Sequence, residues 1–400
     1  MPVSRRGFLR IVGAADAMPF SGAFLSARGL EAQFAEAQAT AQRPRPVLPP
    51  GVDEIRISSN ENPLGPGKAA LDAILGKFPE AGRYPFNSSP GETDLTATIV
   101  AKYRIKPENV VLGAGSQEIL RTAMRAFVTP DRALVTALPT FENCTSYAKR
   151  YELPLVEVKV DSALRLDVEP MIAAASKGAG LLFFNNPNNP TATVHGASTV
   201  ADMVERVRKA SPGTVILIDE AYHDYVTDPA YQTAIPLALS TPNVIVARTF
   251  SKAYGMAGLR MGYAVGHPET IKKMAEWDAG SGTSSLNVLA MHAGLAAIEQ
   301  DASFITAERA RNKEVRDFTM KWFADRGMKP TDSQANFMFV NIGRPAKAFR
   351  EACKAKGVLV ARDFPPFEKT HCRISYGTMA EMQKAVAVFD QVLAKKATAA

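Results

Sequence analysis

The stretch VIVARTFSKAYGMAGLRMGYAV, Val244 to Val265, contains two apolar runs that enclose a lysine and an arginine. Its runs VIVA and GYAV are apolar at every position, which predicts strands covered on both faces. Helix-period segments separate similar runs elsewhere in the chain, so we predict an α/β fold with a mainly parallel sheet covered by helices. The other runs are VVL (110–112), ALVT (133–136), LPLVEV (153–158), LLFF (181–184) and VILI (215–218).

The pattern of elements changes near residue 300. A long charged segment, 301–327, is typical of a helix, and ANFMFVNI and HCRISYG are typical of strands. This predicts a smaller α+β domain after the larger one. The expected boundaries are 52–80 for an N-terminal arm that forms part of the small domain, 81–297 for the large domain and 298–395 for the C-terminal small domain.

Composition excludes several classes of protein. The 400 residues are 46% hydrophobic and 22% charged, which is typical of a globular chain of two domains. The net charge of +7 includes no block of like charges and no basic stripe interleaved with aromatic residues, so no nucleic-acid partner is expected. Three cysteines form no CxxC pair and five histidines lie far apart, so neither a disulfide scaffold nor a metal site is expected.

The N-terminus resembles an export signal. Paired arginines in SRRGFLR precede a weakly apolar run and small residues, which predicts a twin-arginine signal peptide over 1–39 and a periplasmic or exported protein. A proline-rich linker follows over 40–51. A disordered basic leader and an uncleaved membrane anchor are the alternatives, although Asp16 and Pro19 disfavour a spanning helix. The twin-arginine machinery carries folded proteins, which suits a chain that takes up a cofactor before export.

Polar motifs follow four of the apolar runs. LLFF is followed by NNPNNPT, VILI by DEAY, VIVA by RTFSK and VVL by GAGSQE. Ligands of open α/β sheets bind beyond the carboxyl ends of the strands, where such residues lie. Asn189, Asp219 and Lys252 follow one another at about the length of a βαβ unit, so we expect their side chains to converge at one edge of the sheet.

Two of these motifs suit an anion. GAGSQE places the backbone amides of Gly115, Ser116 and Gln117 at a strand-to-helix turn, where the helix dipole favours negative charge. Such glycine turns are common, so this motif is weak alone. Arg260 leads directly into a buried strand and therefore needs a partner, which is either a surface carboxylate or a bound phosphate.

Asp219 and Lys252 add acid–base and nucleophilic chemistry. Asp219 is either a helix N-cap or a carboxylate that keeps a heteroaromatic nitrogen protonated, and Lys252 is either a surface lysine or an amine that captures an aldehyde. A phosphate, a protonated ring nitrogen and an aldehyde together specify pyridoxal 5'-phosphate, held by lysine as a Schiff base.

At this point the chain resembles the fold-type I aminotransferases of classes I and II, in the histidinol-phosphate aminotransferase-like branch. The resemblance runs from about Ile55 to Ile374 and rests on motifs in a fixed order: SSNENPLGP, RYP, GAGSQE, LPTF, NNPNNPT, IDEAY, TFSKAYGMAGLRMGY, QANF and CRISYGT. It implies that Lys252 holds the cofactor, that Asp219 pairs with the ring nitrogen, and that Tyr222 and Asn189 bind the ring hydroxyl. Phe141 would stack on the ring, unless it is a core residue.

The resemblance also implies phosphate and substrate contacts. Arg373 matches the arginine that binds the anionic group of the substrate, unless it is an exposed strand residue. Tyr84 matches a tyrosine that reaches the phosphate of a neighbouring subunit, which implies a homodimer with shared sites. The expected phosphate contacts are Ser116, Gln117, Thr249, Ser251 and Arg260.

The expected reaction moves an amino group from a donor to a 2-oxo acid by a ping-pong mechanism. The donor is an amino acid or a phosphorylated amino alcohol such as histidinol phosphate, since Arg373 can pair with carboxylate or phosphate. Departures from the histidinol-phosphate branch, among them Ala192 and the GSQE sequence, weaken the transfer of that substrate. The alternatives are a decarboxylase or a carbon–sulfur lyase of the same fold, and a non-catalytic exported binding protein.

Overall fold

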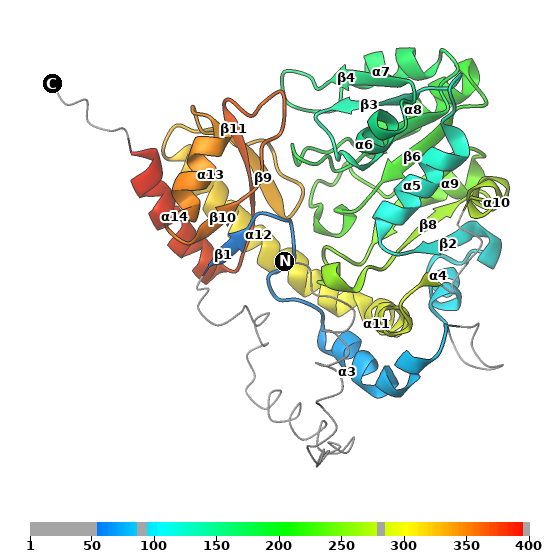
Figure 1. Ribbon diagram of the computed structural model, residues 1–400, viewed down its shortest axis with the longest axis horizontal. Coiled ribbons are helices and arrows are strands. Elements are labelled where there is room, and N and C mark those ends of the chain that lie inside the picture. The colour runs from blue at the N-terminus through cyan, green and yellow to red at the C-terminus, as the bar shows by residue number, and fades with distance from the viewer. Residues whose placement is uncertain (1–53, 86–93, 278–284, 395–400) are drawn as a thin grey trace, which may run out of the picture. The chain divides into compact units, whose positions relative to one another are not determined.

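The computed structural model describes residues 54–85, 94–277 and 285–394, so the predicted leader and linker lie outside the described residues. A seven-stranded sheet forms the large domain, with the strand order β2-β8-β7-β6-β5-β3-β4 (Figure 1). Its strands are β2 (Val110–Gly113), β3 (Leu134–Leu138), β4 (Leu155–Lys159), β5 (Leu181–Asn185), β6 (Val215–Asp219), β7 (Val244–Thr249) and β8 (Gly262–Gly266).

The sheet is parallel except at β8, which is antiparallel to both of its neighbours, β7 and β2. The pairs β3–β4, β3–β5, β5–β6 and β6–β7 are parallel. The prediction of a mainly parallel sheet is therefore confirmed, and the carboxyl ends of β5, β6 and β7 lie side by side.

Both faces of this sheet are covered, as the continuously apolar runs predict. In β6, Val215 and Leu217 belong to one hydrophobic core, and Ile216 and Ile218 belong to another. The first core includes residues of α5 (Ser116–Phe127), α6 (Asn143–Arg150) and α10 (Pro268–Ala275). The second includes residues of α4 (Leu95–Tyr103), α7 (Val168–Ala175), α8 (Ala197–Ala210), α9 (Ile235–Ser240) and α11 (Val288–Glu299).

A second, smaller assembly of strands and helices has its own hydrophobic core, in which Phe323, Phe349 and Phe389 pack. Strand β1 (Ile55–Ile57) pairs in parallel with β10 (Val358–Val360), and β9 (Phe337–Asn341) pairs antiparallel with β11 (His371–Ser375). The helices here are α12 (Asp301–Ala324), α13 (Ala346–Lys354) and α14 (Met379–Leu393). The segment 301–327 is thus a long helix, as its sequence predicts.

The N-terminal arm divides between the two assemblies. Its strand β1 pairs with β10, whereas α3 (Lys68–Lys77) contacts α11 and places Ala70 in a core of the large sheet. The predicted domain boundaries themselves stay predictions. Short 3₁₀ helices complete the described elements: η2 (Phe78–Gly82), η3 (Pro107–Asn109), η4 (His223–Tyr225) and η5 (Ala257–Leu259).

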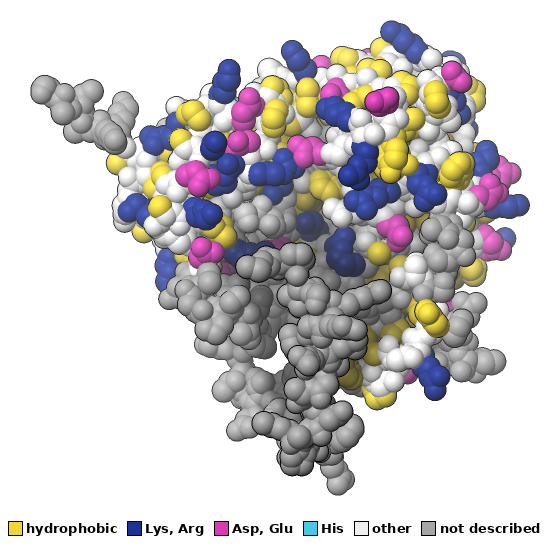
Figure 2. Space-filling view, in the orientation of Figure 1, with side chains coloured by type: hydrophobic (Ala, Val, Ile, Leu, Met, Phe, Trp, Pro, Cys, Tyr) yellow, Lys and Arg dark blue, Asp and Glu magenta, His cyan; other side chains and the backbone are white. Residues whose placement is uncertain are grey.

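The described surface mixes charges of both signs. On the face shown in Figure 2, Lys and Arg side chains alternate with Asp, Glu and apolar side chains. Within the described ranges, no helix combines the length and the apolar character that crossing a bilayer requires. Cys144, Cys353 and Cys372 are buried free thiols.

Candidate active site

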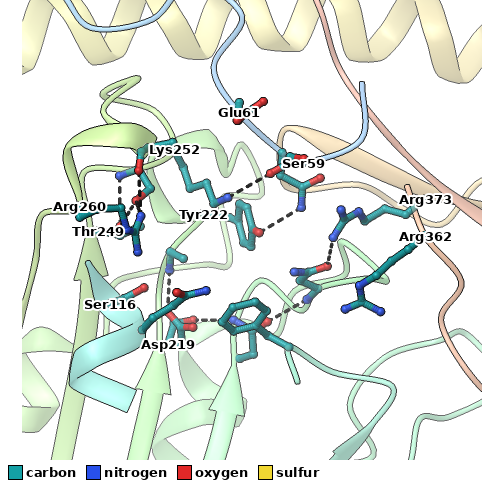
Figure 3. Close-up of a pocket in the computed structure, with 18 residues that line it drawn as sticks. Ser59, Glu61, Ser116, Asp219, Tyr222, Thr249, Lys252, Arg260, Arg362 and Arg373 are labelled. Carbon is teal, nitrogen blue, oxygen red and sulfur yellow. Dashed lines mark hydrogen bonds between the residues drawn. The ribbon is translucent and has the colours of Figure 1, made fainter. Parts of the chain in front are cut away.

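A cavity of about 280 Å³ lies where the carboxyl ends of β5, β6 and β7 meet the N-terminal arm and β11 (Figure 3). Eleven of the predicted site residues line it: Ser116, Gln117, Phe141, Asn189, Asp219, Tyr222, Thr249, Ser251, Lys252, Arg260 and Arg373. Residues separated by up to 257 positions thus meet in one place, as the rule for open α/β sheets predicts.

Lys252 lies at the centre of this cavity. Its Nζ donates to the carbonyl of Ser59 at 3.4 Å and lies 5.6 Å from the ring centroid of Tyr222. Desolvation, helped by the charge of Arg373, lowers the pKa of Lys252 to about 8. A large share of this amine is therefore uncharged and nucleophilic near pH 8.

Asp219 ends β6 and is 1% exposed. Desolvation raises the pKa of this carboxyl to about 7, against the opposing effects of the Ala221 amide, 3.2 Å away, and of Lys252. A fully buried carboxylate that accepts a single hydrogen bond from the described residues is costly unless a cation or a proton donor joins it. Asp219 is therefore suited to hold a proton in common with a basic ring nitrogen.

The opposite wall of the cavity is a chain of hydrogen bonds. Arg373 donates from Nη1 to Asn189 Oδ1 at 2.7 Å and from Nη2 to the carbonyl of Ser58 at 2.6 Å, while its Nε has no partner among the described residues. Burial lowers the pKa of Arg373 to about 10. Asn189 is itself held by Asn185, whose Oδ1 accepts from the Asn189 amide at 2.9 Å.

The end of the cavity near β7 is built for an anion. Arg260 has left-handed backbone angles and donates from Nη1 to Ser251 Oγ at 3.3 Å, and Thr249 Oγ1 bonds the same hydroxyl at 2.9 Å. Helix α5 begins at Ser116, so its positive end lies here. Arg260 makes no ion pair with a carboxylate of the described residues, which leaves its charge available to a ligand.

Two glycines make room for this anion site. A Cβ on Gly262 would lie 2.7 Å from the backbone nitrogen of Ser116, and a Cβ on Gly115 would collide with the guanidinium of Arg260. Gly115 also has a φ of 76°, which L side chains rarely adopt. The cradle between α5 and Arg260 therefore requires glycine at both positions.

Sequence reasoning assigned no role to several residues that line the cavity: Ser59, Asn60, Glu61, Asn185, Ala221, Ala257 and Arg362. Arg362 is the most consequential, since it adds a third guanidinium beside Arg373. It follows β10 closely, but this strand has only three residues, so its apolar pattern is too short to point to the residues after it. Arg362 is paired with Glu142 in the cavity mouth, with Nη1 and Oε1 3.1 Å apart.

Tyr84 does not line this cavity. It follows η2 and is 74% exposed, so its predicted contact with the phosphate of a neighbouring subunit stays a prediction. Phe141 does line the cavity and is half-buried, but whether it stacks on a cofactor ring also stays a prediction.

Comparison with known proteins identifies the family. The model of "Aminotransferase class I and II" matches residues 52–389. This chain belongs to the class I and II aminotransferases. It is 32% identical over 343 residues to the histidinol-phosphate aminotransferase of Moorella thermoacetica, covering 86% of each chain. It is 31% identical to the aromatic amino acid aminotransferase of Thermobifida fusca, over 83% of this chain and 89% of the relative.

A solved structure supports the same conclusion. The histidinol-phosphate aminotransferase of Sinorhizobium meliloti, in complex with pyridoxal-5'-phosphate, superposes with a TM-score of 0.76 at 27% identity, over 85% of this chain and 90% of that one. The predicted fold, the predicted aminotransferase activity and the predicted cofactor, pyridoxal phosphate, are confirmed. The cavity fits this cofactor, since a glycine cradle for an anion, a buried carboxyl and an amine of lowered pKa all face it.

Proposed function

We propose that this aminotransferase takes its amino group from a donor that carries a distal anionic group, either a carboxylate or the phosphate of a compound such as histidinol phosphate. The observation that supports this proposal is the placement of three arginines. Figure 3 shows Arg260 on one side of Lys252, and Arg362 and Arg373 together on the other side. One cationic end suits the cofactor phosphate, and the other suits the anion of the donor.

The roles of the residues follow from their contacts. When bound, pyridoxal phosphate supplies an aldehyde for an amine and a ring that takes up an electron pair. Lys252 would move the proton of the donor Cα, because burial lowers the pKa of its amine to about 8 and leaves part of it uncharged near neutral pH. Asp219 would share a proton with the ring nitrogen, and Tyr222 and Asn189 would bind the ring hydroxyl, to which Tyr222 would donate. Thr249, Ser251, Arg260, Ser116 and Gln117 hold the phosphate.

Arg373 binds the anion of the donor. Its fork of donors faces the cavity, and its two bonds to Asn189 and Ser58 fix the orientation of the guanidinium. The ring centroids of Phe364 and Phe337 lie 4.8 and 5.5 Å from Arg373 Cζ. These apolar rings exclude water around the charge and so strengthen an ion pair with the donor.

The proposed assembly is a homodimer in which each subunit contributes residues to the site of the other. Leu71, Leu75, Phe78 and Tyr84 are exposed apolar side chains on α3, η2 and the residues after η2, and 60% of Phe78 is accessible. Covering them with a second copy of the chain would bring Tyr84 of one subunit toward the cavity of the other, as the family resemblance implies.

The proposed location is the periplasm, reached by the twin-arginine machinery. This rests on the SRRGFLR motif and the run that follows it. The test is the size of the protein recovered from a periplasmic fraction, compared with a variant in which Arg5 and Arg6 are replaced by lysine. A full-length chain confined to the cytoplasm would contradict the proposal.

The donor is tested by spectroscopy on the purified protein. Single additions of histidinol phosphate, glutamate and aromatic amino acids, each without a 2-oxo acid, are followed in the visible absorption of the bound cofactor. We expect one anionic donor to bleach the visible band stoichiometrically, and a later addition of 2-oxo acid to restore it. Bleaching by the aromatic amino acids alone, whose side chains carry no anionic group, would contradict the assignment of the two arginines.

A further inference from the structure

Asn60 joins three parts of the chain at the wall of the cavity. It is 1% exposed and lies just after β1. Its side-chain Nδ2 donates to Tyr222 Oη at 3.1 Å, and its backbone carbonyl accepts from Asn336 Nδ2 at 3.0 Å. Each polar group of Asn60 has a partner, which is typical of a buried residue with a specific position to keep.

Ser375 determines which way the Asn60 amide faces. The backbone N–H of Asn60 donates to Ser375 Oγ at 2.9 Å, so the single hydroxyl proton of Ser375 is free to donate elsewhere. It donates to Asn60 Oδ1 at 2.7 Å. With Oδ1 fixed as the acceptor, Nδ2 must face Tyr222 and act as a donor.

The orientation of the Asn60 side-chain amide sets the direction in which the Tyr222 hydroxyl can donate. Tyr222 Oη accepts a hydrogen bond from Asn60, and it has no other hydrogen-bond partner among the described residues. Its own proton is therefore available to a group in the cavity. The ring itself is fixed, since Tyr222 is 3% exposed and packs edge-on against Phe337 at 5.0 Å.

We propose that Asn60 is a positioning residue for Tyr222. Its side-chain amide donates to the tyrosine hydroxyl and cannot accept a hydrogen bond from it, so the tyrosine hydroxyl proton is directed toward the bound cofactor. The inference rests on the proposed function, in which Tyr222 donates to the ring hydroxyl. It also explains the residue type, because asparagine tolerates the left-handed backbone at this position, where φ is 56°.

The same arm couples Tyr222 to the strand that binds the donor. Arg373 and Ser375 are two residues apart on β11, so they lie on one face of that strand. Arg373 donates to the carbonyl of Ser58, and Ser375 bonds Asn60, two residues further along the arm. The arm thus holds the donor-binding arginine and the tyrosine in a fixed relation.

Charged groups from several elements face the Tyr222 hydroxyl. Burial raises the pKa of Tyr222 to about 12, while Arg373 on β11 and the hydrogen bond from Asn60 act in the opposite direction. Asp219 at the end of β6 adds to the rise, and Lys252 lies over the ring. Loss of the Asn60 donor therefore makes the hydroxyl a weaker donor to any ligand.

The test is a pH titration of the visible absorption of the holoenzyme without donor. Asn60→Asp is isosteric but replaces the donor by an acceptor, so the tyrosine proton turns toward the new carboxylate. We expect the midpoint of this pH titration, followed in the visible band, to rise by about one pH unit. A rise of this size corresponds to the loss of one hydrogen bond to a charged group. Asn60→Gly, which suits the left-handed backbone, should raise it by less.

Two controls separate positioning from other causes. Asn336→Ala loosens the same stretch of backbone without touching Tyr222, and should leave the midpoint unchanged. In a Tyr222→Phe background, Asn60→Asp should shift the midpoint by much less than it does in the wild type, because the tyrosine proton is gone.

The inference is overturned by an unshifted midpoint in a cofactor-loaded Asn60→Asp variant, or by a shift that is undiminished in the Tyr222→Phe background. The latter would show that the added charge alone acts on the cofactor. Failure of the wild type to form any visible band would instead overturn the proposed function, and this inference with it, so the two failures are distinguishable.

Discussion

The carboxyl of Asp219 and the amine of Lys252 face one cavity from neighbouring strands, and burial drives both toward their uncharged forms. Asp219 ends β6 with a pKa of about 7, and Lys252 follows β7 with a pKa of about 8. In ordinary positions these pKa values are separated by more than six units. Both groups can therefore change their protonation near neutral pH, which suits chemistry that moves a proton between carbon and nitrogen.

Burial of Asp219 predicts that the free energy of unfolding of the cofactor-free protein decreases as the pH rises. Because its folded pKa is raised above the unfolded value, its contribution to stability is full below about pH 4 and is lost as pH rises through 7. Asp219→Asn removes this loss. Denaturant unfolding should show the free energy of unfolding of the variant rising by about 3 kcal/mol relative to wild type between pH 5 and pH 8. A constant difference across this range would contradict the buried placement of Asp219.

Arg373→Gln should weaken the binding of the donor and not the binding of the cofactor. Losing a charged fork of hydrogen bonds costs about 1.5–3 kcal/mol, so kcat/KM for an anionic donor should fall about 10- to 150-fold. Binding of pyridoxal phosphate, followed by the visible band, should change little. Arg373→Lys keeps the charge but loses the bidentate fork. Its kcat/KM for an anionic donor should therefore lie between the values of the wild type and of Arg373→Gln. Equal losses for anionic and neutral donors would contradict a role in anion recognition.

We expect Glu142 to compete with the donor for Arg362. The two side chains are paired at the mouth of the cavity and both are partly exposed, so the pair is weak. Glu142→Gln should therefore lower KM for anionic donors by about two- to fivefold, consistent with a surface ion pair. Arg362→Gln is the matched opposite, and should raise that KM. The comparison is made with a neutral aliphatic donor, whose KM should stay constant; a parallel change there would refute the competition.

Shared sites in a homodimer predict complementation. Protomers with Lys252→Ala and protomers with Tyr84→Ala should each be inactive or strongly impaired, whereas dimers reassembled from a mixture contain one site with both residues intact. Activity should therefore return on mixing. Phe78→Asp places a charge in the exposed apolar surface of η2 and should produce monomers in sedimentation experiments. Complementation by fully monomeric protein would contradict the shared-site arrangement.

Much of this site was predictable because the polar motifs follow buried strands. Asp219 and Lys252 come directly after runs that are apolar at every position, and parallel neighbouring strands bring such residues to one edge. The direction of β8 was not predicted, since a run such as GYAV fits a buried strand of either direction. The 12 residues between Thr249 and Gly262 do not decide the direction either, because a crossover connection needs about a dozen residues.

Other features depend on contacts across long sequence distances. Asn60 and Ser375 are separated by 315 positions, and no local pattern indicates that their polar groups bond one another. Arg362 follows a strand of only three residues, which is too short to recognise by its apolar pattern. The pKa values of Asp219 and Lys252 follow from burial, and burial is known only once both assemblies are in place.

The role of Lys252 is tested most directly by the visible absorption of the purified protein after addition of pyridoxal phosphate. The wild type should develop a protein-bound visible band that persists through gel filtration. Lys252→Ala should bind the cofactor through the anion cradle of Arg260 and α5 without forming that band. A band of equal intensity in Lys252→Ala, or its absence from the wild type, would contradict the assignment of Lys252.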